Sequence, residues 1–345
     1  MKNGFQWCRH CGRPHALDAV RCPSTGASLA QSIHTARPFT PAGALPVIAG
    51  KYRLGRLLGS GAFGRVHEAE NIALRRPVAI KILTSRSEDA ARRMRREARV
   101  LANLNHVNIC GVYDLGTLED GRQFLVLERL RGETLDGRLK REKRLSLEQA
   151  VSIFSQMLSA LQAAHAAGII HRDLKPANVF LVEEPGSTPI VKLVDFGLAK
   201  DLLDQSSPTA AGIRCGSPTH MSPEQVRGEA LDGRSDLFAV GIMFYEVLAG
   251  GHPFYAPTLG EIIHRIVKSP TPSLRRMRVS LPAWIDDFVR GALEKDPDYR
   301  YGSAAEMQRV LLERDSWRQP SISDDSTTDV FLPRIRASSS NTPTT

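Results

Sequence analysis

The sequence of 345 residues lacks several features that mark other classes of protein. It has no run of 18 or more apolar residues, so we expect no transmembrane helix. Its first residues, Met1 to Trp7, lack the apolar stretch of a signal peptide. No internal repeat is present. These absences predict a soluble, cytoplasmic protein that does not act at a membrane, and 42% hydrophobic residues are enough for a sizeable core.

Cysteine is scarce, and its distribution is uneven. There are five cysteines, an odd number, and Cys8, Cys11 and Cys22 lie together near the start. This pattern favours metal binding and reduced thiols over a disulfide framework. Cys8-x-x-Cys11 followed by Cys22 resembles a zinc ribbon, in which two such turns supply four thiolates to Zn²⁺.

The fourth ligand of that ribbon is absent. Thr25 stands where it is expected, and a hydroxyl is a poor ligand for zinc. His10 or His15 would have to take its place. Two interpretations stay open, a zinc-binding head and a loose head without metal.

Acidic residues are outnumbered by basic ones, and the net charge is +9. A basic balance can attract nucleic acid or acidic lipid. Here the arginines are dispersed over expected helices and loops instead of forming one stripe, so we expect no nucleic-acid partner.

Composition divides the chain into four segments. Residues 1–26 form the cysteine-containing head, and residues 27–51, rich in Ala, Pro and Gly, are typical of a linker. Residues 52–316 contain the regular hydrophobic patterns of a folded domain. Residues 317–345 are rich in Ser and Thr and predict a disordered tail.

The domain changes character along its length, which indicates an α+β protein. Before residue 130 the patterns predict short strands and one helix, from Ala90 to Leu104. After that they predict mostly helices. Ser146 and Gln149 have the spacing of a capping box, and the stretch from Leu237 to Leu248 is apolar almost all round, as in a buried helix.

Five short segments follow one another in this domain, each of them weak evidence by itself. They are Gly59-Ser60-Gly61-Ala62-Phe63-Gly64-Arg65-Val66, Val78-Ala79-Ile80-Lys81, His171-Arg172-Asp173-Leu174-Lys175-Pro176-Ala177-Asn178, Asp195-Phe196-Gly197 and Ser222-Pro223-Glu224. In this order they resemble the signature of a eukaryotic-type serine/threonine protein kinase, in the style of its bacterial members. The resemblance implies a bilobal fold, with a small antiparallel β lobe carrying one helix and a larger, mainly helical lobe.

The glycine-rich segment and the strand after it match the nucleotide-binding part of such a kinase. Glycines let a hairpin backbone close over phosphates with its N–H groups facing them. Leu127 matches the residue behind the adenine, and the backbone from Glu128 to Leu130 matches the hinge. The residues expected to contact ATP are Leu58, Gly59, Ser60, Gly61, Ala62, Phe63, Gly64, Val66, Ala79, Lys81, Glu128 and Leu130.

The catalytic groups of the family fall on matching positions. Lys81 is expected on the α- and β-phosphates, held by Glu97 from the following helix. Asp173 matches the residue that orients the attacking hydroxyl, and Lys175 the lysine that steadies the γ-phosphate. Phosphoryl transfer depends mostly on such positioning and on electrostatic stabilisation.

Two further positions match the metal ligands. The resemblance makes Asn178 and Asp195 the Mg²⁺ ligands, because this hard cation prefers oxygen donors. Mn²⁺ is the second candidate cation.

The segment from Asp195 to Glu224 matches an activation loop. Its hydroxyl candidates for phosphorylation are Ser206, Ser207 and Thr209. Arg172 is the residue that would bind the added phosphate.

Structural roles follow for several more residues. We expect Glu224 to pair with Arg300, Asp236 to support the catalytic loop and His165 to be a hydrogen-bonded core histidine. His220 and Ser222 depart from the usual Tyr and Ala of the family and would change acceptor preference.

The sequence thus predicts an active, autophosphorylating kinase with protein substrates, for which a homodimer is a candidate assembly. A pseudokinase scaffold is the first rival, opposed by the intact catalytic set. A small-molecule phosphotransferase of related fold is the second, opposed by the long loop before Ser222-Pro223-Glu224. A third makes the head the functional end and the kinase its regulator.

Overall fold

A computed structural model describes residues 5–7, 14–16, 21, 46–61, 64–85, 88–183, 188–196, 218–278 and 280–315. The chain divides into two compact units, residues 1–46 and 47–345. In the first unit, β1 (Phe5–Trp7) pairs with β2 (Pro14–Ala16) in antiparallel register. Cys8, Cys11 and Cys22, the predicted zinc ligands, lie outside the described residues, and so does His10. The zinc site therefore stays a prediction.

The second unit begins with a six-stranded antiparallel sheet in the order β3-β4-β5-β6-β8-β7. Its strands are β3 (Val47–Ile48), β4 (Tyr52–Gly61), β5 (Gly64–Asn71), β6 (Arg76–Leu83), β7 (Val112–Thr117) and β8 (Gln123–Glu128). The linker prediction over residues 27–51 is wrong at its end, because Val47 and Ile48 pair with Arg53 and Tyr52 as the first strand of the sheet.

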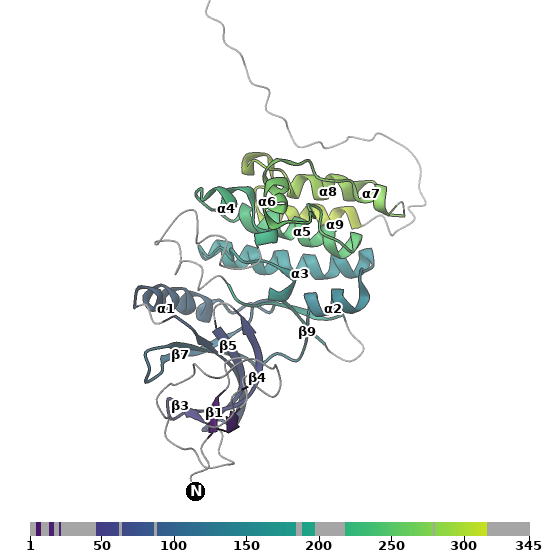
Figure 1. Cartoon of the computed structure of the whole chain (residues 1–345). Coiled ribbons are helices and arrows are strands. Elements are labelled where there is room, and N and C mark those ends of the chain that lie inside the picture. Colours follow the sequence, from purple (N-terminus) through teal and green to yellow (C-terminus); the bar gives the residue numbers. More distant parts are fainter. Residues whose placement is uncertain are drawn as a thin grey trace, which may run out of the picture. The chain divides into compact units, whose positions relative to one another are not determined.

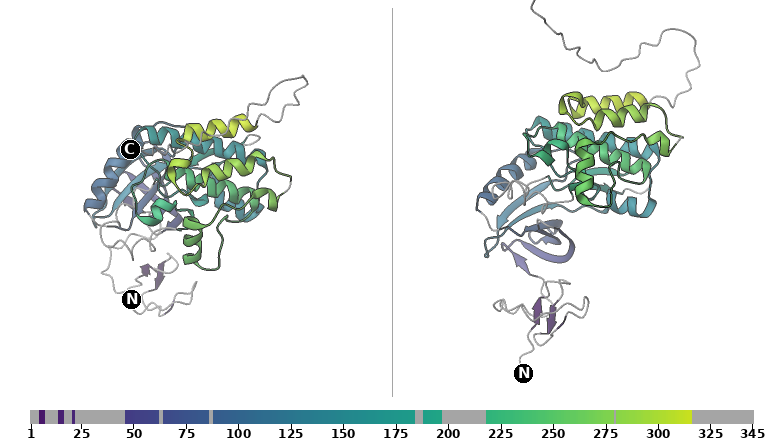
Figure 2. Two further views of the ribbon diagram at one scale, coloured as in Figure 1. Left: turned by 90° about the horizontal axis from the view of Figure 1, so that it is seen from above. Right: turned by 45° about the horizontal axis from the view of Figure 1, so that its top comes forward.

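One helix accompanies this sheet, as the sequence predicts. Helix α1 (Glu88–Asn103) packs on the sheet through the fully buried Met94 and Ala98, which meet Leu83 and Leu125. Figures 1 and 2 show α1 beside the strands and the other helices of this unit gathered together. Leu101, one turn further along α1, joins the core of the helical lobe instead.

The rest of the second unit is mainly helical. Its helices are α2 (Leu135–Glu142), α3 (Leu147–Ala166), α4 (Pro223–Arg227), α5 (Arg234–Ala249), α6 (Leu259–Lys268), α7 (Leu274–Met277), α8 (Trp284–Ala292) and α9 (Ala304–Asp315), with the short 3-10 turns η1 (Pro176–Asn178), η3 (Pro218–His220) and η4 (Pro297–Tyr299). Over the described part of the chain, no helix is both long and apolar enough to cross a membrane.

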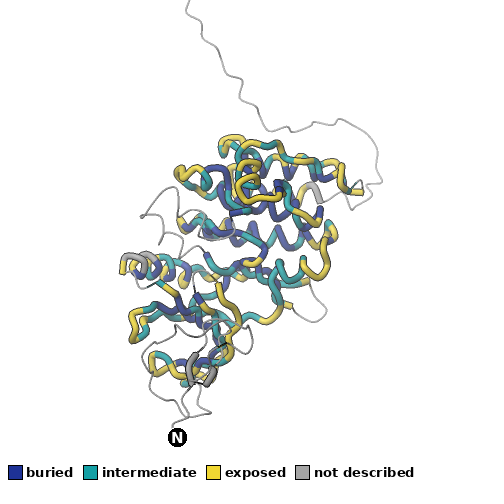
Figure 3. Tube along the Cα trace, in the orientation of Figure 1, coloured by how far each residue is buried: buried dark blue, intermediate teal, exposed yellow. Residues whose placement is uncertain are grey.

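Helices α3 and α5 form the centre of the helical lobe, where buried segments concentrate (Figure 3). Helix α3 begins with the predicted capping box, in which Ser146 accepts from Gln149 N and Gln149 accepts from Ser146 N. Helix α5 is buried on nearly every side, and it ends at Gly250, whose φ of 78° suits glycine. Both predictions are confirmed.

A second sheet has three strands in the order β11-β10-β9. It consists of β9 (Gly132–Thr134), β10 (Val179–Val182) and β11 (Ile190–Leu193). Strand β10 starts directly after Asn178, and Asp195 follows β11 by two residues. The segment after α1 joins this sheet, because Cys110 N donates to Leu193 O at 3.0 Å and Leu193 N donates to Asn108 O at 2.8 Å. The sheet therefore connects the two lobes next to Asn178 and Asp195.

Candidate active site

Asp173 lies at the centre of the loop before β10. It is only 8% exposed, and its Oδ2 accepts from Lys175 Nζ at 2.8 Å and from Asn178 Nδ2 at 3.1 Å. Asn178 Nδ2 also donates to the Asp173 carbonyl at 2.7 Å. These bonds hold the buried carboxylate in one orientation. The structure thus brings these three predicted site residues together.

Asp236 on α5 supports this loop through hydrogen bonds to its backbone. Its carboxylate, 2% exposed, accepts from His171 N at 2.8 Å and from Arg172 N at 2.9 Å. Its Oδ2 also lies 2.8 Å from His165 Nε2. The supporting role of Asp236 is confirmed, and His165 is hydrogen-bonded as expected, with its side chain half-buried.

Arg172 has a strained backbone at this point. Its φ of 63° is in the left-handed region, which costs a residue other than glycine about 1–3 kcal/mol. The bond to Asp236 and the bond from Gln225 Nε2 to Arg172 O, at 2.9 Å, hold this conformation. This bonded conformation of Arg172 sets the direction of the backbone at the next residue, Asp173.

His171 is fully buried and connects the loop to the segment of Asp195. Burial lowers its pKa, so the ring is neutral near pH 7 and its Nε2–H donates to Val194 O at 3.1 Å. The ring also packs against Phe196, with 4.5 Å between ring centroids. The sequence analysis missed this role, because it depends on a contact between two separate motifs.

Lys81 on β6 reaches the helical lobe. Its Nζ lies 2.7 Å from Asp195 Oδ1, and the Lys81 side chain is 12% exposed. Ile80 and Ile82 face the core on either side, so the alternation of the strand turns Lys81 to the opposite face. Glu97 lies half-buried on α1, and its expected contact with Lys81 stays a prediction.

The glycine-rich hairpin joins β4 to β5 as expected. Gly59, Ser60 and Gly61 are exposed on β4, and no atom lies within 4 Å of a Cβ built on either glycine. Gly64 on β5 is different, because a Cβ there would meet Ile82 O at 2.3 Å. This close approach requires glycine. Ala62 and Phe63 lie outside the described residues.

Other residues expected at the nucleotide surround this hairpin or follow β8. Ala79 is buried on β6, Leu58 is exposed on β4, and Val66 is half-buried on β5. At the hinge, Glu128 N donates to Gly111 O at 2.9 Å. The Glu128 carboxylate accepts from Lys192 Nζ at 2.8 Å, which ties the hinge to β11. Leu130 follows, half-buried.

The residues predicted to hold Mg²⁺ offer suitable atoms. Asn178 uses its Nδ2 on Asp173, which leaves Oδ1 as the atom able to bind a cation, and Asp195 offers carboxylate oxygens. Within the described ranges, no group of three or more His, Cys, Asp or Glu could hold a metal. A magnesium ion needs only one or two such ligands besides phosphate and water, so Asn178 and Asp195 fit it.

Residues 197–217, which form most of the predicted activation loop, lie outside the described residues. Ser206, Ser207 and Thr209 are among them.

An ion pair holds the end of the predicted loop at Glu224. Glu224 Oε1 lies 2.8 Å from Arg300 Nη1, and both side chains are buried. Burial would raise the pKa of Glu224, but Arg300 holds it below its usual value. This predicted ion pair is confirmed.

Comparison with known proteins agrees with this geometry. Residues 52–312 match the family model described as a protein kinase domain. Over 77% of its length the chain is 41% identical to the serine/threonine-protein kinase pkn3 of Myxococcus xanthus, and it covers 51% of that protein. It is 37% identical to Pkn1 of Myxococcus xanthus, over 88% of the chain and 45% of the relative. It is 36% identical to PrkC of Bacillus subtilis, over 76% of the chain and 40% of the relative. The chain thus spans about half the length of the curated relatives it matches.

Proposed function

The chain belongs to the protein kinase family, and we propose that it transfers the γ-phosphate of ATP to Ser or Thr hydroxyls of proteins. The buried Asp173 carboxylate, fixed by Lys175 and Asn178, is the observation that carries this proposal. An anion held in this way can accept the proton of an attacking hydroxyl. The names of the relatives support Ser and Thr as acceptors.

Each residue of the site has a task in that reaction. Asp173 orients the acceptor hydroxyl and takes its proton, and the Lys175 ammonium beside it attracts the γ-phosphate. Lys81 holds the α- and β-phosphates, exchanging its bond to Asp195 for bonds to the nucleotide. The backbone of the β4–β5 hairpin covers the phosphates. These groups act mainly by position and charge, as phosphoryl transfer requires.

Asn178 and Asp195 are the residues that would hold Mg²⁺. When bound, this cation, or Mn²⁺ in its place, neutralises the charge that builds up on the phosphates. The contribution of the chain is to keep Asn178 Oδ1 turned away from Asp173 through the two bonds of its Nδ2.

Autophosphorylation is part of the proposal. Ser206, Ser207 and Thr209 are the candidate acceptors within the chain, and a homodimer would let one copy phosphorylate the other. Arg172, next to Asp173, would bind the phosphate once it is added. We place this activity in the cytoplasm.

For the N-terminal head, zinc is the candidate metal. Cys8, Cys11 and Cys22 are the proposed ligands, supported by their spacing and by the β1–β2 hairpin, whose strands flank the first two. The metal content of the purified full chain decides between this head and one without metal. One zinc ion per chain, lost in the Cys8→Ser variant, would support the first.

The test of the function is phosphate transfer from γ-labelled ATP with Mg²⁺, in the wild type and in Asp173→Asn. We expect label on Ser or Thr of a protein substrate and of the chain itself, located by mass spectrometry, and none in the variant. Absence of label from the wild type, with Mn²⁺ also supplied, would favour the scaffold interpretation.

A further inference from the structure

Basic side chains gather where α7, the turn between α2 and α3, and the end of α5 meet. Arg278, directly after α7, joins these elements, because its Nη1 donates to Leu145 O at 3.2 Å and to Leu248 O at 3.5 Å. Leu145 N in turn donates to Val247 O at 2.8 Å. We call this junction the basic surface, and its cations are Lys143, Arg144, Arg275, Arg276 and Arg278.

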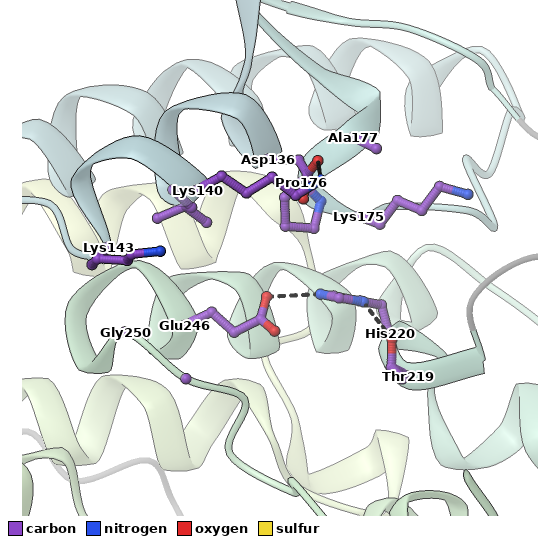
Figure 4. Close-up of a pocket in the computed structure, with 12 residues that line it drawn as sticks. Asp136, Lys140, Lys143, Lys175, Pro176, Ala177, Thr219, His220, Glu246 and Gly250 are labelled. Carbon is purple, nitrogen blue, oxygen red and sulfur yellow. Dashed lines mark hydrogen bonds and ion pairs between the residues drawn. The ribbon is translucent and has the colours of Figure 1, made fainter. Parts of the chain in front are cut away.

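Figure 4 shows one edge of the basic surface, where Lys143 lies near Gly250 at the end of α5. The Arg144 side chain lies against the same glycine, because a Cβ on Gly250 would be 2.8 Å from Arg144 Nε. Glu246, one turn earlier on α5, is bonded to His220 at 2.8 Å, and this pair lies outside the basic surface. The two cations therefore flank the end of α5.

The cations of the basic surface have no carboxylate partner within the described ranges. Lys143, Arg144, Arg275 and Arg276 are exposed, and their side chains form no hydrogen bond or ion pair there. Arg278 donates to main-chain carbonyls, which carry no net charge. The surface can therefore accept several anionic groups without breaking an ion pair.

Two carboxylates lie next to the basic surface, and each has partners of its own. Glu142 pairs with Arg141 at 3.0 Å. Asp286 accepts from Ser273 Oγ and from Leu274 N, both at 2.7 Å. Five cations beside two carboxylates leave the surface with a net positive charge.

One stretch of the sequence has the complementary charge. Residues 321–332, here called the acidic segment, contain Asp324, Asp325 and Asp329 and no Lys, Arg or His. Two other long stretches outside the described residues differ from it, because 27–45 has no acidic residue and 197–217 has two acidic and two basic ones. Charge complementarity therefore singles out the acidic segment.

The acidic segment also has an apolar end. It finishes with Val330, Phe331 and Leu332. Next to the two arginines of α7, the side chain of Met277 is 58% exposed, and its Sδ accepts from Tyr245 OH at 3.2 Å. The surface thus offers an apolar contact beside its cations.

The chain is long enough to bring the acidic segment to the basic surface. Helix α9 ends at Asp315 and packs against α8, which also packs against α7. Packed helices lie about 8–10 Å apart, so the axes of α9 and α7 are within about 20 Å. The nine residues from Asp315 to Asp324 span up to about 30 Å.

We infer that the basic surface binds the acidic segment of the same chain. The carboxylates of Asp324, Asp325 and Asp329 pair with its arginines, and the apolar end lies against Met277. The inference goes beyond the proposed function and does not depend on it. The segment also carries five Ser or Thr hydroxyls, and a phosphate on any of them adds about 1.5–2 negative charges. Phosphorylation of the tail therefore strengthens this contact.

The test is the rate at which chymotrypsin cleaves the full chain after Phe331, measured by mass spectrometry. A bound segment has to leave the surface before the protease can act on it. The reference is a synthetic peptide of residues 317–345. At low salt we expect cleavage to be about fivefold slower in the chain than in the peptide, the size of two or three exposed charge pairs. At about 1 M salt the two rates should approach each other, because surface charges are screened.

Charge reversal on either side should remove the protection. Arg275→Glu/Arg276→Glu changes the surface, and Asp324→Arg/Asp325→Arg changes the segment. Each tail variant is compared with its own peptide. Each double variant alone should be cleaved at the rate of the peptide. Together they should restore slow cleavage, because opposite charges face each other again.

Two further variants complete the design. Arg96→Glu/Arg99→Glu makes the same change of charge on exposed positions of α1, and as the matched control it should keep the slow cleavage. Ser323→Glu/Ser326→Glu adds two carboxylates to the acidic segment and should slow cleavage further.

Equal rates for the wild-type chain and the peptide at low salt would overturn the inference and leave the basic surface to an anionic partner outside the chain. Protection that persists in Arg275→Glu/Arg276→Glu would also overturn it, because the segment would then bind elsewhere. If that variant does not fold, Asp324→Arg/Asp325→Arg decides, since it leaves every described residue unchanged. The assay needs no ATP, so a failure here leaves the proposed function intact, and a chain that protects its tail but transfers no phosphate contradicts the proposed function alone.

Discussion

At the scale of single residues, the buried polar groups explain why the catalytic loop has one shape. Asp236 accepts from two successive backbone N–H groups, of His171 and Arg172, across 65 and 64 residues of sequence. The strained φ of Arg172 would relax without those acceptors. Asp236 is a positioning residue, because it acts on Asp173 through the loop.

Asp236→Asn tests this role. The amide places an N–H group against a backbone N–H, so the loop and Asp173 should shift. We expect kcat to fall by about 100-fold, the effect of a displacement of about 1 Å, with a smaller change in KM for ATP. Steady-state kinetics measure both. Asp287→Asn, on the exposed side of α8, is the control. A change in KM alone would contradict the assignment.

Lys295 is the residue whose environment opposes its charge. Its Nζ is buried without a hydrogen-bond partner among the described residues and lies 3.8 Å from the centre of the Phe254 ring. Burial, with nearby Arg300, lowers the Lys295 pKa to about 7. The ring offsets part of the cost of keeping a charge there.

This lowered pKa makes stability depend on pH. In the unfolded chain the lysine has a pKa of about 10.4. Between pH 10 and pH 7, Lys295 is therefore mostly protonated in the unfolded state and mostly neutral in the folded state. Lys295→Met removes the penalty. We expect its free energy of unfolding, relative to wild type, to rise by about 1–4 kcal/mol as pH falls from 10 to 7 and then to level off. Urea unfolding at several pH values measures this, with Lys268→Met as control. A difference independent of pH would show that Lys295 is not the cause.

At the scale of elements, the sequence predicts the helices that have a long pattern of apolar residues, and it does not predict a short strand that lacks one. The capping box of α3 and the all-round apolar pattern of α5 predict their helices because each spans several turns. Strand β7 has no such pattern. Asp114 and Gly116 interrupt it, its register with β8 shifts between Val112 and Asp114, and it lies at the edge of the sheet.

The glycine at position 116 of β7 has a packing reason. A Cβ at this position would lie 2.5 Å from the ring of Phe124, which is 1% exposed on the paired strand. We expect Gly116→Ala to lower the free energy of unfolding by about 1–3 kcal/mol through overpacking. Gly116→Ala/Phe124→Leu should recover part of the loss in the same denaturation experiment. Gly260→Ala, in α6 with no atom near its Cβ, should cost nothing. Equal stability of both alanine variants would refute the packing argument.

The contacts of the candidate site also differ in how far the sequence predicts them. The resemblance predicts Asp173, Lys175 and Asn178 as neighbours, and because they lie within one short segment the structure brings them into contact. The pair of His220 and Glu246 could not be, because 26 residues separate them and only the packing of η3 on α5 brings them together.

At the scale of the whole second unit, a few bonds join the sheet to the helical lobe around the candidate site. Lys81 brings a cation from β6 to Asp195, and the bridge of Ile109 to Leu193 joins the segment between α1 and β7 to β11. His171 then couples the Asp195 segment to the loop of Asp173. The two lobes therefore place their charged groups around one position, where a phosphate would be transferred.

The most direct test of that account is the rate of phosphate transfer from ATP to a Ser/Thr peptide with saturating Mg²⁺, for wild type and Asp173→Asn. ATP affinity is measured on the same samples. We expect kcat to fall by at least about 100-fold, since general acid–base groups contribute that much, while ATP binds equally well. An Asp173→Asn variant that transfers phosphate at the wild-type rate would contradict the account.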